Sequence, residues 1–110
     1  MKVFVAQEND KFDYSAAEQF GDLVFLTQHE YRSYSSPANG KIRDEIFDGL
    51  SEITPEDYLL LTGNPITMSY AFHIAACYLH DQGCSSVKIL RWNSATLGYT
   101  IVDFPLHYHD

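Results

Sequence analysis

Two histidines and a cysteine stand at helical spacing in the second half of the chain, where His73, Cys77 and His80 occupy positions i, i+4 and i+7. Imidazole and thiolate groups are zinc ligands, and a spacing of four on a helix can direct two of them at one ion. The third residue lies a further turn away, and one helix rarely surrounds a metal alone. Asp81 or a histidine of the C-terminal tail would have to complete the site, so we predict no metal here.

A thiol beside an imidazole could also form a nucleophile and base, with His73 activating Cys77. Nothing in the sequence supplies an oxyanion hole or a third group, and the motifs G-x-S-x-G, H-E-x-x-H and C-x-x-C are absent. Glu8, Asp10 and Asp13 cluster after the first apolar block and could bind a cation or act as a base. A solvated loop is the simpler explanation, so we favour a non-enzymatic protein with no catalytic residue and no cofactor.

The segment "TGNP", which ends at Pro65, has two interpretations. Gly63 permits a tight turn, Asn64 is a favoured N-cap, and proline suits the first helical position, so the segment could simply turn a strand into a helix. Free N–H groups at a helix start can also hold an anion. The alternative is therefore a small nucleotide- or anion-binding module after the third strand, with the binding residues Gln7, Glu8, Thr62, Gly63, Asn64 and Thr67.

The elements that would position these residues follow from apolar periodicity and turn signals. The expected strands are 2–7, 22–27, 58–62, 86–93 and 98–104, and the expected helices are 15–21, 40–52 and 65–82. Continuous apolar strands alternating with helices predict the α/β class, here a small three-layer Rossmann-like or flavodoxin-like sandwich. Its sheet should be mostly parallel with an antiparallel C-terminal hairpin, and ligands would bind beyond the carboxyl ends of its strands.

The expected helix 65–82 has two faces. Its apolar face should pack on the sheet and comprises Met68, Ala71, Phe72, Ala75, Ala76 and Leu79. The other face has no Lys, Arg or Glu, and such depletion of charge is typical of a protein interface. We predict a contact surface there, formed by Ile66, Tyr70, His73, Cys77 and His80, with Arg91 and Trp92 as a further candidate pair and the loop 28–39 as second choice.

Composition narrows the classes of function. The 110 residues fit one domain, 1–110, and 45% hydrophobic content suffices for a packed core. A formal charge of −8 disfavours binding to nucleic acid, although it leaves an acidic nucleic-acid mimic as a weaker alternative. We expect no membrane association, because the sequence shows no signal peptide and no apolar run of transmembrane length. Two cysteines without a disulfide framework indicate a reducing cytoplasm.

Three stretches resemble a group of small proteins found in tailed-phage genomes. They are "VFVAQE" at 3–8, "DYLLLTGNP" at 57–65 and "KILRWN" at 88–93, which match a V-x-V-x-Q start, a D-Y-L-L-x-x-G-[DN]-P turn and an L-[KR]-W-[DN] strand. The resemblance implies a small accessory protein made in an infected bacterium and acting in the host cytoplasm. We therefore expect a homo-oligomer that works by binding a host or phage protein.

Overall fold

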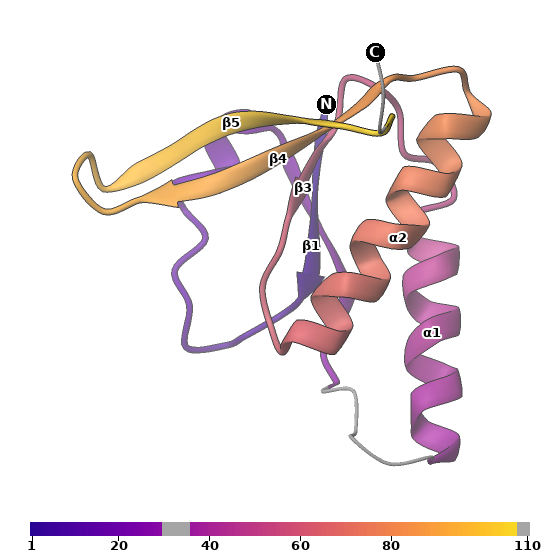
Figure 1. Ribbon diagram of the computed structural model, residues 1–110. Coiled ribbons are helices and arrows are strands. Elements are labelled where there is room, and N and C mark those ends of the chain that lie inside the picture. Colours follow the sequence, from indigo (N-terminus) through magenta and orange to yellow (C-terminus); the bar gives the residue numbers. More distant parts are fainter. Residues whose placement is uncertain (30–35, 108–110) are drawn as a thin grey trace.

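The computed structural model describes residues 1–29 and 36–107 and contains one five-stranded sheet in the order β2-β1-β3-β4-β5 (Figure 1). The strands are β1 (Lys2–Gln7), β2 (Asp22–Thr27), β3 (Tyr58–Leu60), β4 (Ser86–Asn93) and β5 (Gly98–Pro105), and the helices are the 3₁₀ turn η1 (Ala17–Phe20), α1 (Pro37–Gly49) and α2 (Pro65–Asp81). β1 to β4 are parallel and β5 is antiparallel to β4. The predicted α/β fold is confirmed, and the strand order is that of flavodoxin-like sheets.

The two α-helices lie on one face of the sheet, and the segment containing η1 lies on the other. The chain moves from β1 outward to β2, then reverses across β1 to β3 and continues to β4. Because crossovers between parallel strands are right-handed, a reversal of direction sends the connection to the opposite face. The topology thus places η1 on one side and both α1 and α2 on the other (Figure 1).

The main core fills the space between the sheet and the two helices. The stripe predicted on α1 and just after it is fully buried: Ile42, Ile46, Leu50 and Ile53 are 0–2% exposed. From α2 the buried side chains are Thr67, Ala71, Ile74, Ala75 and Leu79. The apolar face predicted for this helix is therefore rotated toward α1, because α2 packs against that helix as well as against the sheet. Met68, Phe72 and Ala76 are only partly buried, and of these Phe72 and Ala76 pack against the margin of this core.

A second, smaller core lies on the opposite face. Tyr14 and Ala17 pack there against Val3, Val5 and Leu60, with Phe20 at the margin. The helix expected at 15–21 is reduced to a single 3₁₀ turn, and its N-cap Ala16 makes no side-chain hydrogen bond. The third layer of the sandwich is therefore mostly an irregular segment. Aromatic contacts hold it against the strands, with 5.2 Å between the ring centroids of Tyr14 and Phe25 and 5.5 Å between those of Phe20 and Tyr58.

Polar side chains fix the starts of several elements. Helix α1 begins at Pro37, three residues earlier than predicted, and the Ser36 side chain caps it by accepting from Ala38 N. The Asp57 carboxylate accepts from the backbone N–H groups of Lys2 and Thr54, both at 2.8 Å, and so joins the start of β1 to the start of β3. Of the long loop expected at 28–39, residues 30–35 lie outside the described residues.

Candidate functional site

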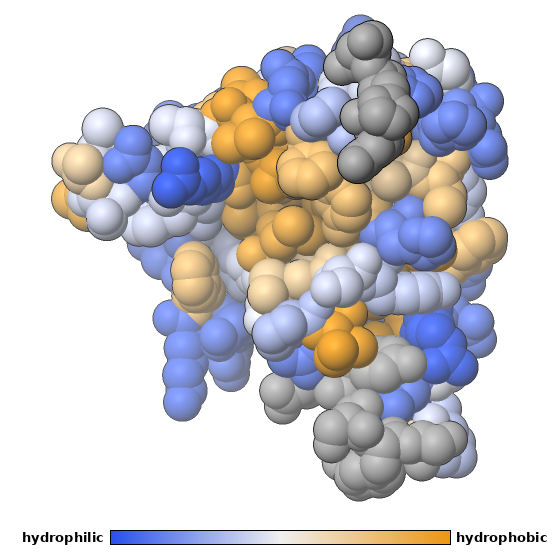
Figure 2. Space-filling model, viewed as in Figure 1, coloured by the Kyte–Doolittle hydropathy of each residue, from blue (hydrophilic) through white to orange (hydrophobic). Residues whose placement is uncertain are grey.

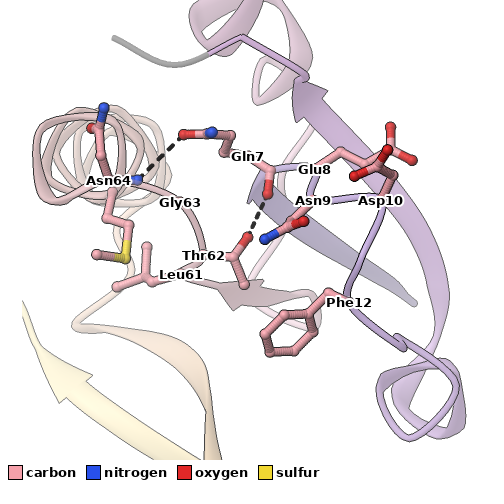
Figure 3. A pocket seen from close by; sticks show the side chains of 10 residues that line it. Gln7, Glu8, Asn9, Asp10, Phe12, Leu61, Thr62, Gly63 and Asn64 are labelled. Carbon is pink, nitrogen blue, oxygen red and sulfur yellow. Dashed lines mark hydrogen bonds between the residues drawn. The ribbon is translucent and has the colours of Figure 1, made fainter. Parts of the chain in front are cut away.

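The turn after β3 contacts the end of β1 through side-chain hydrogen bonds (Figure 3). Gln7 Oε1 accepts from Asn64 N at 3.3 Å, and the Thr62 hydroxyl donates to the Gln7 carbonyl at 2.7 Å. Gly63 has φ of +103°, and a Cβ on it would collide with Cβ and Oε1 of the Gln7 side chain. The turn therefore needs glycine for two reasons, its backbone conformation and the close approach of Gln7.

The start of helix α2 is capped from within the chain. Asn64 Oδ1 accepts from Thr67 N at 2.8 Å, and Pro65 occupies the first turn. The Thr67 side chain is fully buried, so its hydroxyl does not face the cleft. Two backbone N–H groups at this helix start are therefore already bonded within the chain: that of Asn64 to the Gln7 side chain, and that of Thr67 to the Asn64 side chain. An anion would have to use the N–H groups that remain.

A polar cleft of about 670 Å³ opens beside this turn. Its lining brings together five of the six residues predicted to bind a ligand, with Thr67 as the exception: Gln7, Glu8, Thr62, Gly63 and Asn64. Asn9, Asp10 and Phe12 from the segment after β1 complete one wall (Figure 3). The cleft lies at the carboxyl ends of β1 and β3, where the strand order reverses and ligands bind in open α/β sheets. The carboxylates of Glu8 and Asp10 make it unsuited to an anion and better suited to a neutral or cationic group.

The outward face of α2 is only partly as predicted. Ile66 is 54% exposed, and His73, Cys77 and His80 are exposed as well. Tyr70 is instead half-buried against the main core, because the rotation of the helix toward α1 carries it inward. The exposed part of this face is therefore narrower and less aromatic than the sequence indicated.

The histidines and the cysteine on this face do not converge on one point. His73 Nε2 lies 3.8 Å from Cys77 Sγ, whereas the His80 ring lies beside His107, with 5.8 Å between ring centroids. Among the described residues, no three His, Cys, Asp or Glu side chains are grouped so that they could hold a metal ion.

Arg91 and Trp92 point to opposite faces of the hairpin, as neighbours on a strand must. Trp92 lies on the η1 side, 46% exposed, with its ring 5.2 Å from that of Tyr99 in an edge-on contact. Burial raises the pKa of the Tyr99 phenol, and Tyr14 and Asp13 raise it further. The predicted pair therefore cannot act together with the α2 face as one surface, because only Arg91 is on the same side as α2.

An apolar groove between the hairpin and α2 was not predicted from the sequence. This hairpin groove has a volume of about 400 Å³ and is lined by Leu61, Pro65, Met68, Ser69, Phe72, Ile89 and Phe104. Figure 2 shows apolar side chains gathered in the hollow between the hairpin and the helix. Phe104 is 45% exposed and contacts Phe72 edge-on, with 4.9 Å between centroids. The signal in the sequence is "IVDF", which puts apolar residues on both faces of the edge strand β5.

A model of a known protein family matches the chain. The model of the phage Pam3 gp32-like protein family covers residues 1–106, almost the whole chain. The chain belongs to this family. The expected relationship to phage proteins is thereby confirmed, because the family is one of phage proteins. No curated protein matches the chain, and no solved structure does. Within the ranges 1–29 and 36–107, none of the helices of this family member has both the length and the apolar character needed to cross a bilayer.

Proposed function

We propose that this protein is a non-enzymatic phage accessory protein that acts by binding another protein, from the host or the phage, in the cytoplasm of the infected cell. The observation that supports this proposal is the hairpin groove, because it exposes apolar side chains beside a sheet edge. Phage-family membership supplies the setting.

The composition of the groove suits a protein ligand. Among the described residues that line the groove, Ser69 is the one with a polar side chain, and none carries a charge. Protein interfaces have such cores, depleted of charge and enriched in aromatic residues and methionine. Phe72 and Phe104 form the aromatic pair at its centre, so a substitution there should remove most of the affinity.

A matched pair of phenylalanines allows a specific test. Phe104 in the groove is 45% exposed and Phe47 on α1 is 49% exposed, and each contacts one aromatic ring. Tagged wild type, Phe104→Glu and Phe47→Glu would each be used to capture proteins from a lysate of infected cells. We expect the amount of the captured protein to fall roughly 30-fold or more with Phe104→Glu, as at an interface hot spot, and to stay at the wild-type level with Phe47→Glu. Equal capture by both variants would contradict the proposed surface.

The polar cleft beside Gln7 supports a second candidate function, a small-molecule binding module. Its position at the β1/β3 reversal is the observation that favours it. Thermal denaturation with nucleotides, cyclic nucleotides and small amines would test it, since a ligand at 100 times its Kd stabilises by about 2.7 kcal/mol. Because Glu8 and Asp10 line the cleft, we expect amines to raise the melting temperature more than nucleotides do. An unchanged melting temperature with every compound would argue against this function.

A further inference from the structure

The outer edge of β5 offers a row of hydrogen-bonding groups. The ladder pairs Ser86 with Pro105 and ends at Asn93 with Gly98, and just beyond it Leu106 N donates to Ser85 O. Residues bonded to the neighbouring strand alternate with residues that face away from it. Even-numbered residues of β5 therefore bond to β4, and the N–H and C=O groups of odd-numbered residues face outward. None of the described residues pairs with this edge.

This edge lacks the features that normally prevent pairing with another strand. Protected edges are short, bulged, or carry lysine, proline or a charge directed inward. β5 has eight residues in an unbroken ladder, with Asp103 as its one charged residue and proline only at its last position. Ile101 and Phe104, on opposite faces, are 47% and 45% exposed. The strand is therefore both open and apolar.

The hairpin does not share the negative charge of the rest of the chain. Residues 86–105 contain two basic side chains and one acidic side chain, a formal charge of +1. Because the whole chain has a formal charge of −8, the remaining residues together carry −9. Two copies that meet at their hairpins keep their acidic regions apart.

We propose that two copies of the chain pair antiparallel through their β5 edges, about a two-fold axis at Ile101, to form one continuous ten-stranded sheet. In this register Ile101 faces itself, Tyr99 faces Asp103 of the second copy, and every outward N–H of the strand finds a carbonyl. An axis at Asp103 would oppose two carboxylates, and an axis at Val102 would set Tyr99 against Pro105, which has no N–H.

The two-fold axis runs perpendicular to the sheet, so both pairs of α-helices lie on the same side. Val102 and Phe104 lie on the α2 side of the sheet, whereas Ile101 lies on the η1 side. Pairing therefore joins the hairpin grooves of the two copies into one trough between their α2 helices, with both β5 strands as its floor. The dimer goes beyond the proposed function, and it makes each copy contribute to the surface of the other.

Engineered disulfides test the register directly. Ile101→Cys and Asp103→Cys would each be made in a Cys77→Ser, Cys84→Ser background, which removes both native thiols. Across the axis, paired Cα atoms at position 101 lie about 5.5 Å apart, within the range of a disulfide. Those at position 103 are offset by four residues, about 13 Å, and cannot be bridged. We expect Ile101→Cys to form a disulfide-linked dimer on oxidation and Asp103→Cys to form none, as seen by denaturing electrophoresis without a reductant. Equal cross-linking at both positions would overturn the register.

Sedimentation of the full chain tests the dimer itself. We expect wild type to be dimeric, Ile101→Lys to raise the dimer Kd at least 10-fold because two lysines face each other at the axis, and Ile101→Thr to stay dimeric. Circular dichroism would confirm that each variant folds. A wild type that is monomeric at every concentration overturns the proposal. If substitutions at the β5 edge of such a monomer reduced capture of another protein, the edge would bind that protein and not a second copy. A dimer whose Phe104→Glu variant still captures that protein would refute the proposed function alone.

Discussion

Gln7 Oε1 accepts a hydrogen bond from the backbone N–H of Asn64 at 3.3 Å, across 57 positions of sequence. This contact holds the turn after β3 against the end of β1, and the Thr62 hydroxyl strengthens it by donating to the Gln7 carbonyl. The polar groups at this point of strand reversal thus satisfy one another. The turn is explained by folding alone, and a ligand in the adjoining cleft would have to bind groups that are left over.

The close approach of Gln7 to Gly63 predicts a large loss of stability in Gly63→Ala. The matched control is Gly83→Ala, since Gly83 also has a positive φ, +83°, but an added Cβ there meets nothing within 4 Å. The control should lose about 1–2 kcal/mol from the backbone conformation alone. Gly63→Ala should lose at least about 1 kcal/mol more, because its Cβ collides with Gln7. Urea denaturation of both variants would measure the difference, and equal losses would disprove the collision.

The buried carboxylate of Asp57 predicts a second stability effect. Asp57→Ala leaves the backbone N–H groups of Lys2 and Thr54 without their acceptor, which should cost about 2–4 kcal/mol. The neighbouring Glu56 is exposed, so Glu56→Ala should change the free energy of unfolding by less than about 0.5 kcal/mol. Thermal or urea denaturation distinguishes them. If the two alanine variants were equally stable, Asp57 would have no structural role.

The tip of the hairpin carries a residue in an unfavourable backbone conformation. Leu97 has φ of +53° and is 73% exposed, so no packing compensates for its strain. Asn tolerates this region better than leucine, so Leu97→Asn should stabilise the protein by about 0.5–1 kcal/mol. Denaturation in urea would show the midpoint rise, and a lower midpoint would mean that the leucine makes a stabilising contact.

The raised pKa of Tyr99 predicts a pH effect at alkaline pH. Burial disfavours the phenolate, so the folded state holds this proton more tightly than the unfolded state, whose pKa is near 10.0. The stabilisation is fully present below pH 10 and is lost as the pH rises through the folded pKa. The phenolate absorbance that distinguishes wild type from Tyr99→Phe should therefore appear above pH 10. Titration of Tyr99 at or below the pH of a free tyrosine amide would contradict its burial.

Local patterns predicted the elements well where a single face had to be buried. The spacing of Ile42, Ile46 and Leu50 foretold the core of α1, and the apolar strands foretold a mostly parallel sheet. The start of α1 was also visible as Ser36 before Pro37, an N-cap followed by a favoured first residue, although the segment looked like a loop.

The surfaces were harder to predict, because they depend on how elements pack. Tyr70 is half-buried because α2 packs against α1, and the local sequence of α2 gives no indication of that tertiary contact. The hairpin groove likewise forms between α2 and the hairpin, at the edge of the part of the sheet that α2 covers. It is bounded by Phe72 and Phe104, which are 32 positions apart in the sequence. Helical periodicity could order the side chains around α2, but it could not say which of them another element would cover.

The 3₁₀ turn on the second face has a consequence for local unfolding. The layer that covers this face has one short helical turn and few backbone hydrogen bonds, while β1 beneath it is paired on both sides. Amide protons in residues 9–21 should therefore exchange with solvent through opening of this layer alone, whereas those of β1 should exchange only when the whole domain unfolds. The protein would then have two protection levels, divided by the plane of its sheet.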